Sequence, residues 1–439
     1  MNKNIISNIF FLMSKIKFFI LFIYFINCTN IIRIPFSIKE NIENENKSFM
    51  ENLMKCDIYT QITIGSPSKI IKTSIKFNDY NLYLSGSKVS NHIYDETKSS
   101  SYKKLENSIQ FYNEDFEKGE KGIESFIIGN IKLKEFPFIL VTQERINEIS
   151  SIGLKPNSNF KNNPKANLIE ELKFKNIIDK NIFSVIFNKK EKNKEQTGEI
   201  IIGNYLHDIY NDQYKSTDYI FTKTIDNKIT RFWSFKVDEI KVGLNSILGS
   251  KIINLDIESE VFYGSLTYFY DINETFFESY IDYKECWFEV ASDKYNNKFD
   301  YYVCNKSVFN PSNFPNLTFI SNDLNKSFVF TYQDLFVEKN NLYYFIILFS
   351  QDRDRIYNWI LGKKFLEKYH FVFDQEKLTI GYYTQVYPKN FNWKYFYIFI
   401  AIFIIFILGI ILGYQLIKKP RKIRANELLD VYEYIEQKN

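Results

Sequence analysis

The chain has 439 residues, of which 45% are hydrophobic and 25% are charged, and its formal net charge is +4. This length accommodates two ordinary domains or one large bilobal domain, and the composition is that of a globular rather than a disordered protein. The net charge is small, and no basic stripe alternates with aromatic residues, so the sequence gives no support for nucleic-acid binding.

The first residues have the pattern of a secretory signal peptide. Lys15 and Lys17 precede an unbroken apolar run at 18–26, which small polar residues follow. This run is too short to cross a bilayer, and a basic stretch before a short apolar core is typical of a cleaved signal. A buried core helix or an uncleaved anchor is the alternative. We expect a signal peptide at 1–29, with cleavage near residues 28–30.

A second membrane signal lies near the other end. Residues 395–414 carry no charge, and at about 1.5 Å per residue they are long enough to cross a hydrocarbon core of about 30 Å. We expect a stalk at 387–394, a transmembrane helix at 395–417 and a cytoplasmic tail at 418–439. The orientation follows from the positive charges that come directly after the run, at Lys418, Lys419, Arg421, Lys422 and Arg424. The body of this single-pass, type I protein then faces the lumen or the exterior.

The cysteines and histidines are few and scattered. The chain has four cysteines, of which Cys28 leaves with the signal peptide. In an oxidising lumen Cys286 and Cys304 can form a disulfide, which leaves Cys56 without a partner. No cysteine belongs to a CxxC pair, and the three histidines lie far apart in the sequence. We therefore expect no metal, no cofactor and no Cys–His catalysis.

The first half of the body is expected to be mostly β. Residues 31–52 are polar and predict an exposed N-terminal segment. The short helical period of 166–174 predicts a helix, and the charged stretch 188–197 predicts a surface hairpin. Short runs rich in β-branched and aromatic residues predict strands at 58–64, 70–75, 81–84, 123–128, 136–141, 183–187 and 199–202.

A second β series follows, with one helix expected at 358–369. The sequence thus predicts an N-terminal segment at 30–56, an N-terminal β lobe at 57–215 and a C-terminal β lobe at 216–386. The strands expected in the second lobe lie at 232–242, 261–271, 288–291, 317–320, 328–332, 343–349, 371–373 and 378–383.

Several of these segments resemble the pepsin-like aspartic proteases, the peptidase A1 family that includes the plasmepsins. Residues 359–374 read WILGKKFLEKYHFVFD, with Gly381 after them, and are similar to the WILGDxFLRxYYxVFD close of the family; Lys363 stands in place of its aspartate. The resemblance covers roughly residues 57–385 and implies a mostly β, bilobal pepsin-like fold. Further matching segments are YTQITIGSP at 59–67, NLYL at 81–84, YDETKSSSY at 94–102, NIIDKNIFSVIF at 176–187 and GEIIIGN at 198–204.

The resemblance implies a pair of catalytic aspartates, one from each lobe, which share one proton and activate a water molecule. Counting back from Asn81 places Lys76 at the first aspartate, in a loop (75–80) that is altered throughout. An ammonium group cannot share a proton with a carboxylate in this way. The alternative register makes Asp79 the catalytic residue, but it deletes three residues before Asn81.

The second loop keeps an acid. Residues 255–264, LDIESEVFYG, are similar to the family's VDTGTSLLTG and place Asp256 at the second catalytic position; Asp256 as a simple turn residue is the alternative. If both alignments hold, Lys76 and Asp256 meet across the cleft as a structural ion pair. Phe111 or Tyr112 takes the place of the tyrosine in the flap, the hairpin that covers the family's cleft.

These substitutions predict a membrane-anchored pseudoprotease that binds a polypeptide or a partner protein in its cleft, within the secretory pathway or at the cell surface. The alternatives are an active aspartic endopeptidase with a divergent site and a structural ectodomain without a ligand. After the expected signal peptide, five triplets fit the N-glycosylation pattern, as expected by composition alone in a chain so rich in asparagine; they begin at Asn46, Asn273, Asn305, Asn316 and Asn325.

Overall fold

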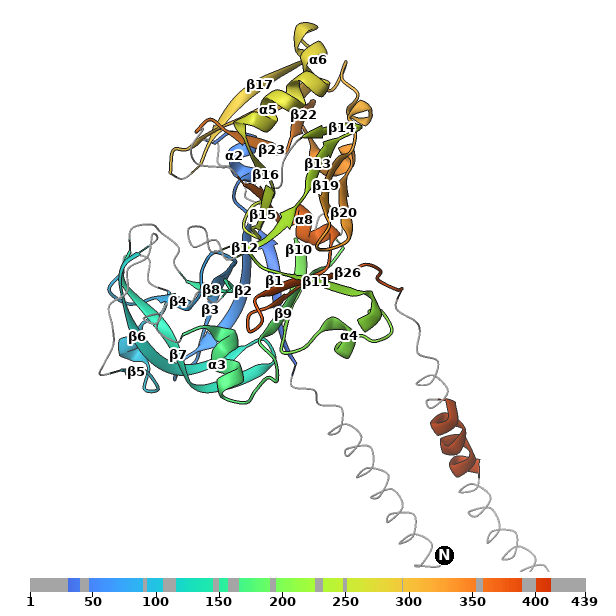
Figure 1. Cartoon of the computed structure of the whole chain (residues 1–439). Helices are drawn as coiled ribbons and strands as arrows, with labels where there is room; N and C mark the ends of the chain where they lie inside the picture. The colour runs from blue at the N-terminus through green and yellow to red at the C-terminus, as the bar shows by residue number, and fades with distance from the viewer. Residues whose placement is uncertain are drawn as a thin grey trace, which may run out of the picture. The chain divides into compact units, whose positions relative to one another are not determined.

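The structure of the protein is a computed structural model, and it separates into two units, Met1–Val386 and Tyr387–Asn439, each described here by itself (Figure 1). The expected signal peptide, the flap residues Phe111 and Tyr112 and the cytoplasmic tail lie outside the described residues. The described residues are 31–39, 47–89, 93–105, 116–144, 150–156, 166–189, 195–225, 232–247, 251–293, 295–352, 358–388 and 400–411.

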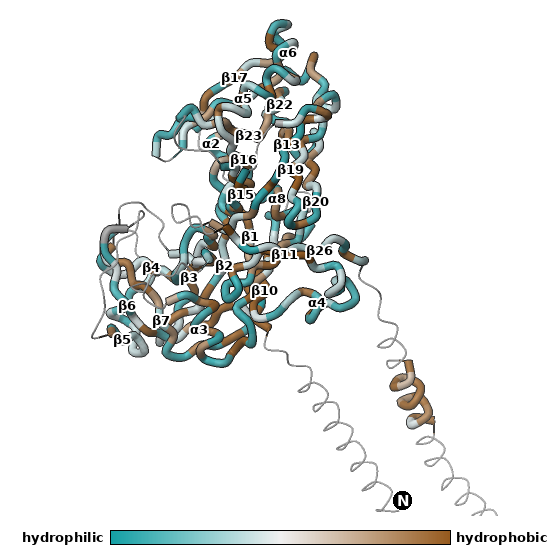
Figure 2. The backbone as a smooth tube through the Cα atoms, in the orientation of Figure 1, coloured by the Kyte–Doolittle hydropathy of each residue, from teal (hydrophilic) through white to brown (hydrophobic). Residues whose placement is uncertain are grey.

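In the second unit, residues 400–411 form a helix with exposed side chains, and Figure 2 colours this helix as hydrophobic along almost all of its length. Within the described part of the chain, no helix is long and apolar enough to cross a membrane. The remainder of the expected 395–417 span lies outside the described residues.

The first unit is built mainly from three sheets, and the largest contains the strands of the N-terminal half together with the last strands of the unit. β25 pairs with β9 on one side and with β26 on the other, so the last strands of the unit join a strand from its middle. In spatial order, the thirteen described strands of this sheet are β11 (Tyr219–Lys223), β26 (Thr379–Tyr383), β25 (Phe371–Asp374), β9 (Ile182–Phe187), β10 (Gln196–Ile202), β1 (Ile32–Lys39), β2 (Asp57–Ile64), β3 (Lys69–Lys76), β8 (Ser151–Gly153), β4 (Leu82–Ser85), β7 (Ile131–Glu144), β6 (Phe116–Ile128) and β5 (Lys103–Lys104).

The other two sheets form the C-terminal lobe, which Figure 1 shows in yellow and orange. The larger has the order β12 (Trp233–Val237), β15 (Lys251–Leu255), β24 (Trp359–Leu361), β16 (Phe262–Ser265), β23 (Ile347–Ser350), β18 (Lys298–Asn305), β22 (Leu342–Phe345) and β21 (Phe336–Lys339), with β17 (Cys286–Ser292) beside β18. The smaller has the order β14 (Asn245–Ile247), β13 (Glu239–Val242), β19 (Leu317–Ser321) and β20 (Lys326–Phe330).

Short helices connect and cover these strands. The expected helix at 166–174 is confirmed as α3, which Asn167 caps by accepting hydrogen bonds from two backbone N–H groups of the first turn. The described helices are α2 (Phe49–Leu53), α3 (Leu168–Phe174), α4 (Leu206–Ile209), α5 (Leu266–Ile272), α6 (Glu278–Asp282), α7 (Tyr332–Leu335), α8 (Lys363–Lys368), the 3₁₀ turns η1 (Glu96–Lys98), η2 (Ser216–Asp218) and η4 (Pro311–Asn313), and the π-helix η3 (Asn273–Phe277).

The main core is apolar and rich in aromatic rings, and it joins the two halves of the unit. Trp233, at the start of β12, is fully buried and packs against Phe183 of β9 and Phe373 of β25. Its indole N–H donates to the backbone oxygen of Leu154, which follows β8, at 2.7 Å. A side chain that opens the second β series is therefore fixed to the first by both packing and a buried hydrogen bond.

The N-terminal segment is a correction to the sequence prediction, because much of 31–52 is not exposed. β1 pairs with β10 on one side and β2 on the other, and alternate side chains of this strand are buried. α2 carries a capping box between Ser48 and Glu51, and Met50 is fully buried against the C-terminal lobe. The polar residues misled the prediction, since a strand with an alternating pattern buries only every second side chain.

Two further corrections concern the C-terminal lobe. The expected helix at 358–369 is a strand, β24, followed by the shorter helix α8, because Trp359 to Leu361 are needed between β15 and β16. The expected strand at 261–271 ends at Ser265, where α5 begins. In both places an apolar run fits either a buried strand or a buried helix, and tertiary pairing decides between them.

Candidate functional site

The centre of the first unit is formed by two copies of one strand arrangement. In the N-terminal copy β3 runs parallel to β8, and in the C-terminal copy β15 runs parallel to β24. Ile75 pairs with Ile152 in the first copy, and Leu255 pairs with Leu361 in the second. Ile75 and Leu255 are thus 180 residues apart in the sequence, and their partners Ile152 and Leu361 are 209 residues apart.

The next pair of strands repeats with the same spacing. Tyr83 of β4 pairs in parallel with Ile139 of β7, and Tyr263 of β16 pairs in parallel with Leu348 of β23. The differences are again 180 (83 and 263) and 209 (139 and 348). The segments 76–81 and 256–261, which lead from the first strand of each copy to the next, therefore have the same length and occupy equivalent places. Lys76 is thus the counterpart of Asp256 in the repeat.

Two glycines give an independent check of this equivalence. Gly153 ends β8, which lies between β3 and β4, and Gly362 directly follows β24, which lies between β15 and β16. In each copy the loop crosses directly over its glycine. A Cβ added to Gly153 would come within 2.5 Å of the backbone oxygen of Asp79, and one added to Gly362 within 2.3 Å of that of Ser259. Only glycine permits so close an approach. Asp79 is thus the counterpart of Ser259, and the register that matches Asp79 with Asp256 does not agree with this geometry.

Lys76 lies at the end of β3 with most of its side chain buried, 12% being exposed. Its Nζ atom is 3.9 Å from Asp79 Oδ2 and 4.0 Å from Glu258 Oε1, so it interacts with a carboxylate from each copy of the repeat. Ser151 Oγ donates a hydrogen bond to the same oxygen of Asp79 at 2.8 Å. The ammonium group compensates two acids that would otherwise repel each other at the junction of the lobes.

Asp256 takes part in the structure of its own loop. Its Oδ1 atom accepts a hydrogen bond from the backbone N–H of Glu258 at 2.9 Å, the pattern of an Asx turn. A cross-lobe ion pair joins Lys76 to Glu258, which stands two residues after Asp256. Phe77 and Ile257, at equivalent places in the two loops, are fully buried and anchor the loops in the core.

A second buried lysine lies beside this site. Lys363, at the start of α8, has 5% of its side chain exposed, and its Nζ atom is 2.7 Å from Glu260 Oε1, 3.2 Å from Gln196 Oε1 and 3.4 Å from Glu367 Oε1. Burial lowers the pKa of Lys363, but attraction from the carboxylates of Glu260 and Glu367 outweighs it, so the pKa is raised overall. Lys363 therefore remains a cation and ties α8 to β10 and to the second loop.

The cysteines are placed as the sequence predicts. Cys286 and Cys304 form a disulfide between the paired strands β17 and β18. Cys56 is free and buried, and its backbone N–H donates to the backbone oxygen of Glu258 at 2.6 Å. Burial raises the pKa of this thiol, so it is an unreactive core group. In the described part of the chain no histidine, cysteine and carboxylate side chains gather in a group of three or more that could hold a metal ion.

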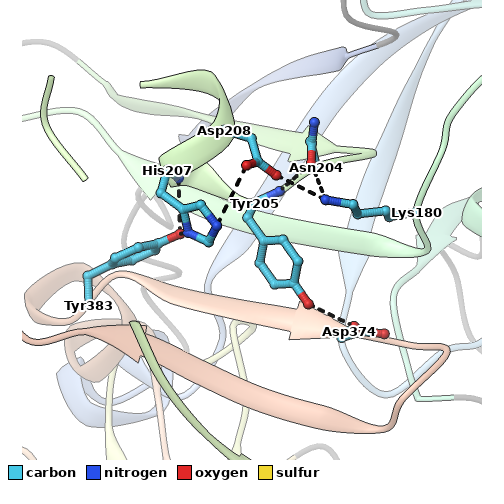
Figure 3. A network of polar contacts seen from close by, with 7 residues as sticks. All are labelled: Lys180, Asn204, Tyr205, His207, Asp208, Asp374 and Tyr383. Atoms are coloured by element: carbon cyan, nitrogen blue, oxygen red, sulfur yellow. Dashed lines mark hydrogen bonds and ion pairs between the residues drawn. The ribbon is translucent and has the colours of Figure 1, made fainter. Parts of the chain in front are cut away.

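A separate polar network lies between α4 and the last strand pair (Figure 3). Tyr383 OH is 2.8 Å from His207 Nδ1 and also accepts from the backbone N–H of His207. Lys180 Nζ is 3.0 Å from Asp208 Oδ2, and Tyr205 OH donates to Asp374 at 3.2 Å. Burial lowers the pKa of His207, which favours the neutral imidazole. Because these groups bind one another, the network fastens α4 to β25 and β26.

This network borders a cavity of about 500 Å³. The cavity is lined by His207, Asp208, Asn211, Tyr214, Lys215, Ser216 and Thr217. Its wall comes from α4, η2 and the chain between them, whereas Lys76 ends β3 and Asp256 directly follows β15. The cavity is therefore no part of the paired-loop site.

The fold and the paired loops agree with the comparison of the sequence with protein-family models. The model of the eukaryotic aspartyl proteases matches residues 58–385. The chain belongs to this family. A search of curated protein sequences finds no match to the chain.

Sequence reasoning brought Lys76, Asp79 and Asp256 to one region but missed the carboxylates that surround the lysines. Glu258 and Glu260 fall in the aligned loop at 255–264, where they carry no motif of their own. A signal was present all the same: the resemblance sets Lys76 and Lys363 at positions where it implies aspartates, and buried lysines are paired with acids almost without exception.

Proposed function

We propose that this chain is a membrane-anchored member of the aspartyl protease family that does not hydrolyse peptides and that holds a polypeptide or a partner protein between its lobes. The observation that carries the proposal is the repeat register, in which Lys76 stands where Asp256 stands in the other copy. Peptide hydrolysis in this family needs two carboxyl groups that share a proton, and a lysine is a cation throughout the acid and neutral range.

The local charges support the loss of catalysis further. In place of a symmetrical acid pair there is an ammonium group with Asp79 and Glu258 at 3.9 and 4.0 Å. The glycines of the family's loops are replaced by Asn78 and Glu258, so two side chains project where the lobes of an active enzyme approach by backbone alone. An ion pair across the lobes holds the two loops together and replaces the catalytic function with a structural one.

The membrane attachment rests on the two ends of the sequence. The uncharged run 395–414, with basic residues after it, favours a single span with a lumenal or extracellular body. The apolar start at 18–26 favours entry into the secretory pathway. Binding of a polypeptide is the function that a family member retains when its lobes remain and its chemistry is lost, because main-chain hydrogen bonds to an extended peptide do not need the catalytic acids.

The test is hydrolysis of a degenerate peptide library by the full chain in detergent, from pH 3 to pH 7, beside the variant Asp256→Asn. General acid–base assistance contributes roughly 10²–10⁴-fold, so we expect turnover at least about 100-fold below that of an active family member. We also expect this turnover to be the same in the wild type and the variant. Hydrolysis that Asp256→Asn abolishes would contradict the proposal.

The same samples test peptide binding. Peptides that stay bound to the protein through gel filtration, and are recovered intact by mass spectrometry, are the expected result. If the chain neither cleaves nor retains any peptide, the binding part of the proposal is wrong and the body is a structural ectodomain.

A further inference from the structure

Two asparagines that fit the N-glycosylation pattern are exposed at opposite ends of one hairpin. Asn316 comes directly before β19 and Asn325 directly before β20, and both are exposed. Leu317 pairs with Phe330 and Ser321 with Lys326, so the two asparagines are at the two ends of the β19–β20 pair. Neither side-chain amide forms a hydrogen bond to another residue that the structure describes. Because both side chains are also exposed, both nitrogens are accessible to solvent.

The triplet at Asn273 is in a different environment. Asn273 begins the π-helix η3 between α5 and α6 and is half-buried. Its Oδ1 atom accepts a hydrogen bond from Tyr302 OH at 3.3 Å, and Tyr302 itself is fully buried in the aromatic core. A sugar on the neighbouring nitrogen would have to displace this contact and the helical turn around it.

Asn305 is also half-buried. Its Oδ1 atom accepts from both the backbone N–H and the hydroxyl of Ser307, at 3.0 and 2.9 Å. Asn46 lies outside the described residues. The geometry thus separates the triplets at Asn316 and Asn325 from the other two that the structure describes, at Asn273 and Asn305.

We propose that Asn316 and Asn325 carry N-linked glycans and that Asn273 does not. This inference rests on the proposed entry into the secretory pathway. The donor is a lipid-pyrophosphate-linked oligosaccharide, and the transferase of the secretory pathway supplies the catalyst. The asparagine Nδ2 atom forms a bond to the anomeric carbon, the bond from that carbon to the pyrophosphate oxygen breaks, and the amide loses one proton as the lipid pyrophosphate leaves.

The glycans would mark one sheet as a surface that faces solvent. β20 is the last strand of the β14–β13–β19–β20 sheet, and its outer backbone groups at Val329 are already bound by Tyr369 OH, at 2.9 and 3.3 Å. A hydrophilic chain at each end of the hairpin, together with this capped edge, prevents another strand from pairing there. A partner protein is therefore not expected to dock on this sheet.

The experiment uses the full chain expressed in a eukaryotic secretory host and compares its mass before and after treatment with a peptide N-glycosidase. Asn316→Gln and Asn325→Gln should each lose one glycan relative to the wild type, and Asn273→Gln should lose none. Asn325 has a positive φ of 46° that glutamine tolerates poorly, so Ser327→Ala, which keeps the asparagine, is the second variant for that triplet and should lose the same glycan.

Protease protection in microsomes separates the two ways in which the inference can fail. A translocated chain with a glycan at Asn273, or without one at Asn316 or Asn325, overturns the assignment and leaves the proposed location intact. A chain that remains accessible to protease overturns the proposed location, and the glycans with it.

Discussion

Replacing Lys76 by aspartate should lower the free energy of unfolding at pH 7 by roughly 3 kcal/mol, clearly more than replacing it by methionine. The methionine variant removes the attraction to Asp79 and Glu258, which lie at 3.9 and 4.0 Å. The aspartate variant adds a third negative charge to the same poorly solvated place. Like charges about 4 Å apart interact with about 4 kcal/mol at the effective dielectric constant found near protein surfaces.

The difference between the two Lys76 variants should depend on pH. A carboxyl group placed beside two others is easier to protonate in the folded chain than in the unfolded chain. Its unfavourable contribution is therefore absent below about pH 4 and appears as the pH rises towards 7. Denaturant unfolding of both variants at pH 4 and pH 7 measures this directly.

Lys69→Asp is the matched control, because Lys69 is exposed at the other end of the same strand. We expect it to change the free energy of unfolding by no more than about 0.5 kcal/mol. If Lys76→Asp were as stable as Lys76→Met at pH 7, the ammonium group would not neutralise acids at the lobe junction. Lys76→Asp should also remain without peptidase activity, because Asp79 and Glu258 still crowd the new acid.

Replacing Lys363 by methionine should destabilise the protein by roughly 3 kcal/mol, the usual result of removing one partner from a buried ion pair. The change keeps most of the side-chain volume, so it tests charge rather than packing. It leaves Glu260 and Glu367, which are only 22% and 20% exposed, without the cation that lies 2.7 and 3.4 Å from them. Thermal and denaturant unfolding of the purified chain provide the measurement.

Lys368→Met is the control on the same helix. Lys368 pairs with Asp334 at 2.6 Å, but the two side chains are 34% and 27% exposed, and such pairs contribute up to about 1 kcal/mol. A double variant, Lys363→Met with Glu260→Gln, should recover part of the lost stability because it removes the uncompensated acid. Equal effects of Lys363→Met and Lys368→Met would show that the buried lysine has no special role.

The sequence by itself determined the family and most of the strands. Alternating apolar residues define β2 and β3, and the segment from Trp359 to Asp374 carries enough of the family pattern to identify it. Local spacing also identified α3, and the scarcity of cysteines left Cys286 and Cys304 as the expected pair, which the structure confirms. Such features depend on residues close in sequence, on a continuous motif or on simple counting, so they can be recognised without a fold.

Only the tertiary structure decided the features that depend on long-range pairing. The insertion of β24 between β15 and β16 makes a strand of residues that have a helical period, and the pairing of β1 with β10 buries a segment that is polar on average. The equivalence of Lys76 and Asp256 rests on a repeated arrangement of strand pairs and not on a repeat in the amino-acid sequence. The acids around the two buried lysines come from distant loops, and their contribution arises from burial, which no local pattern records.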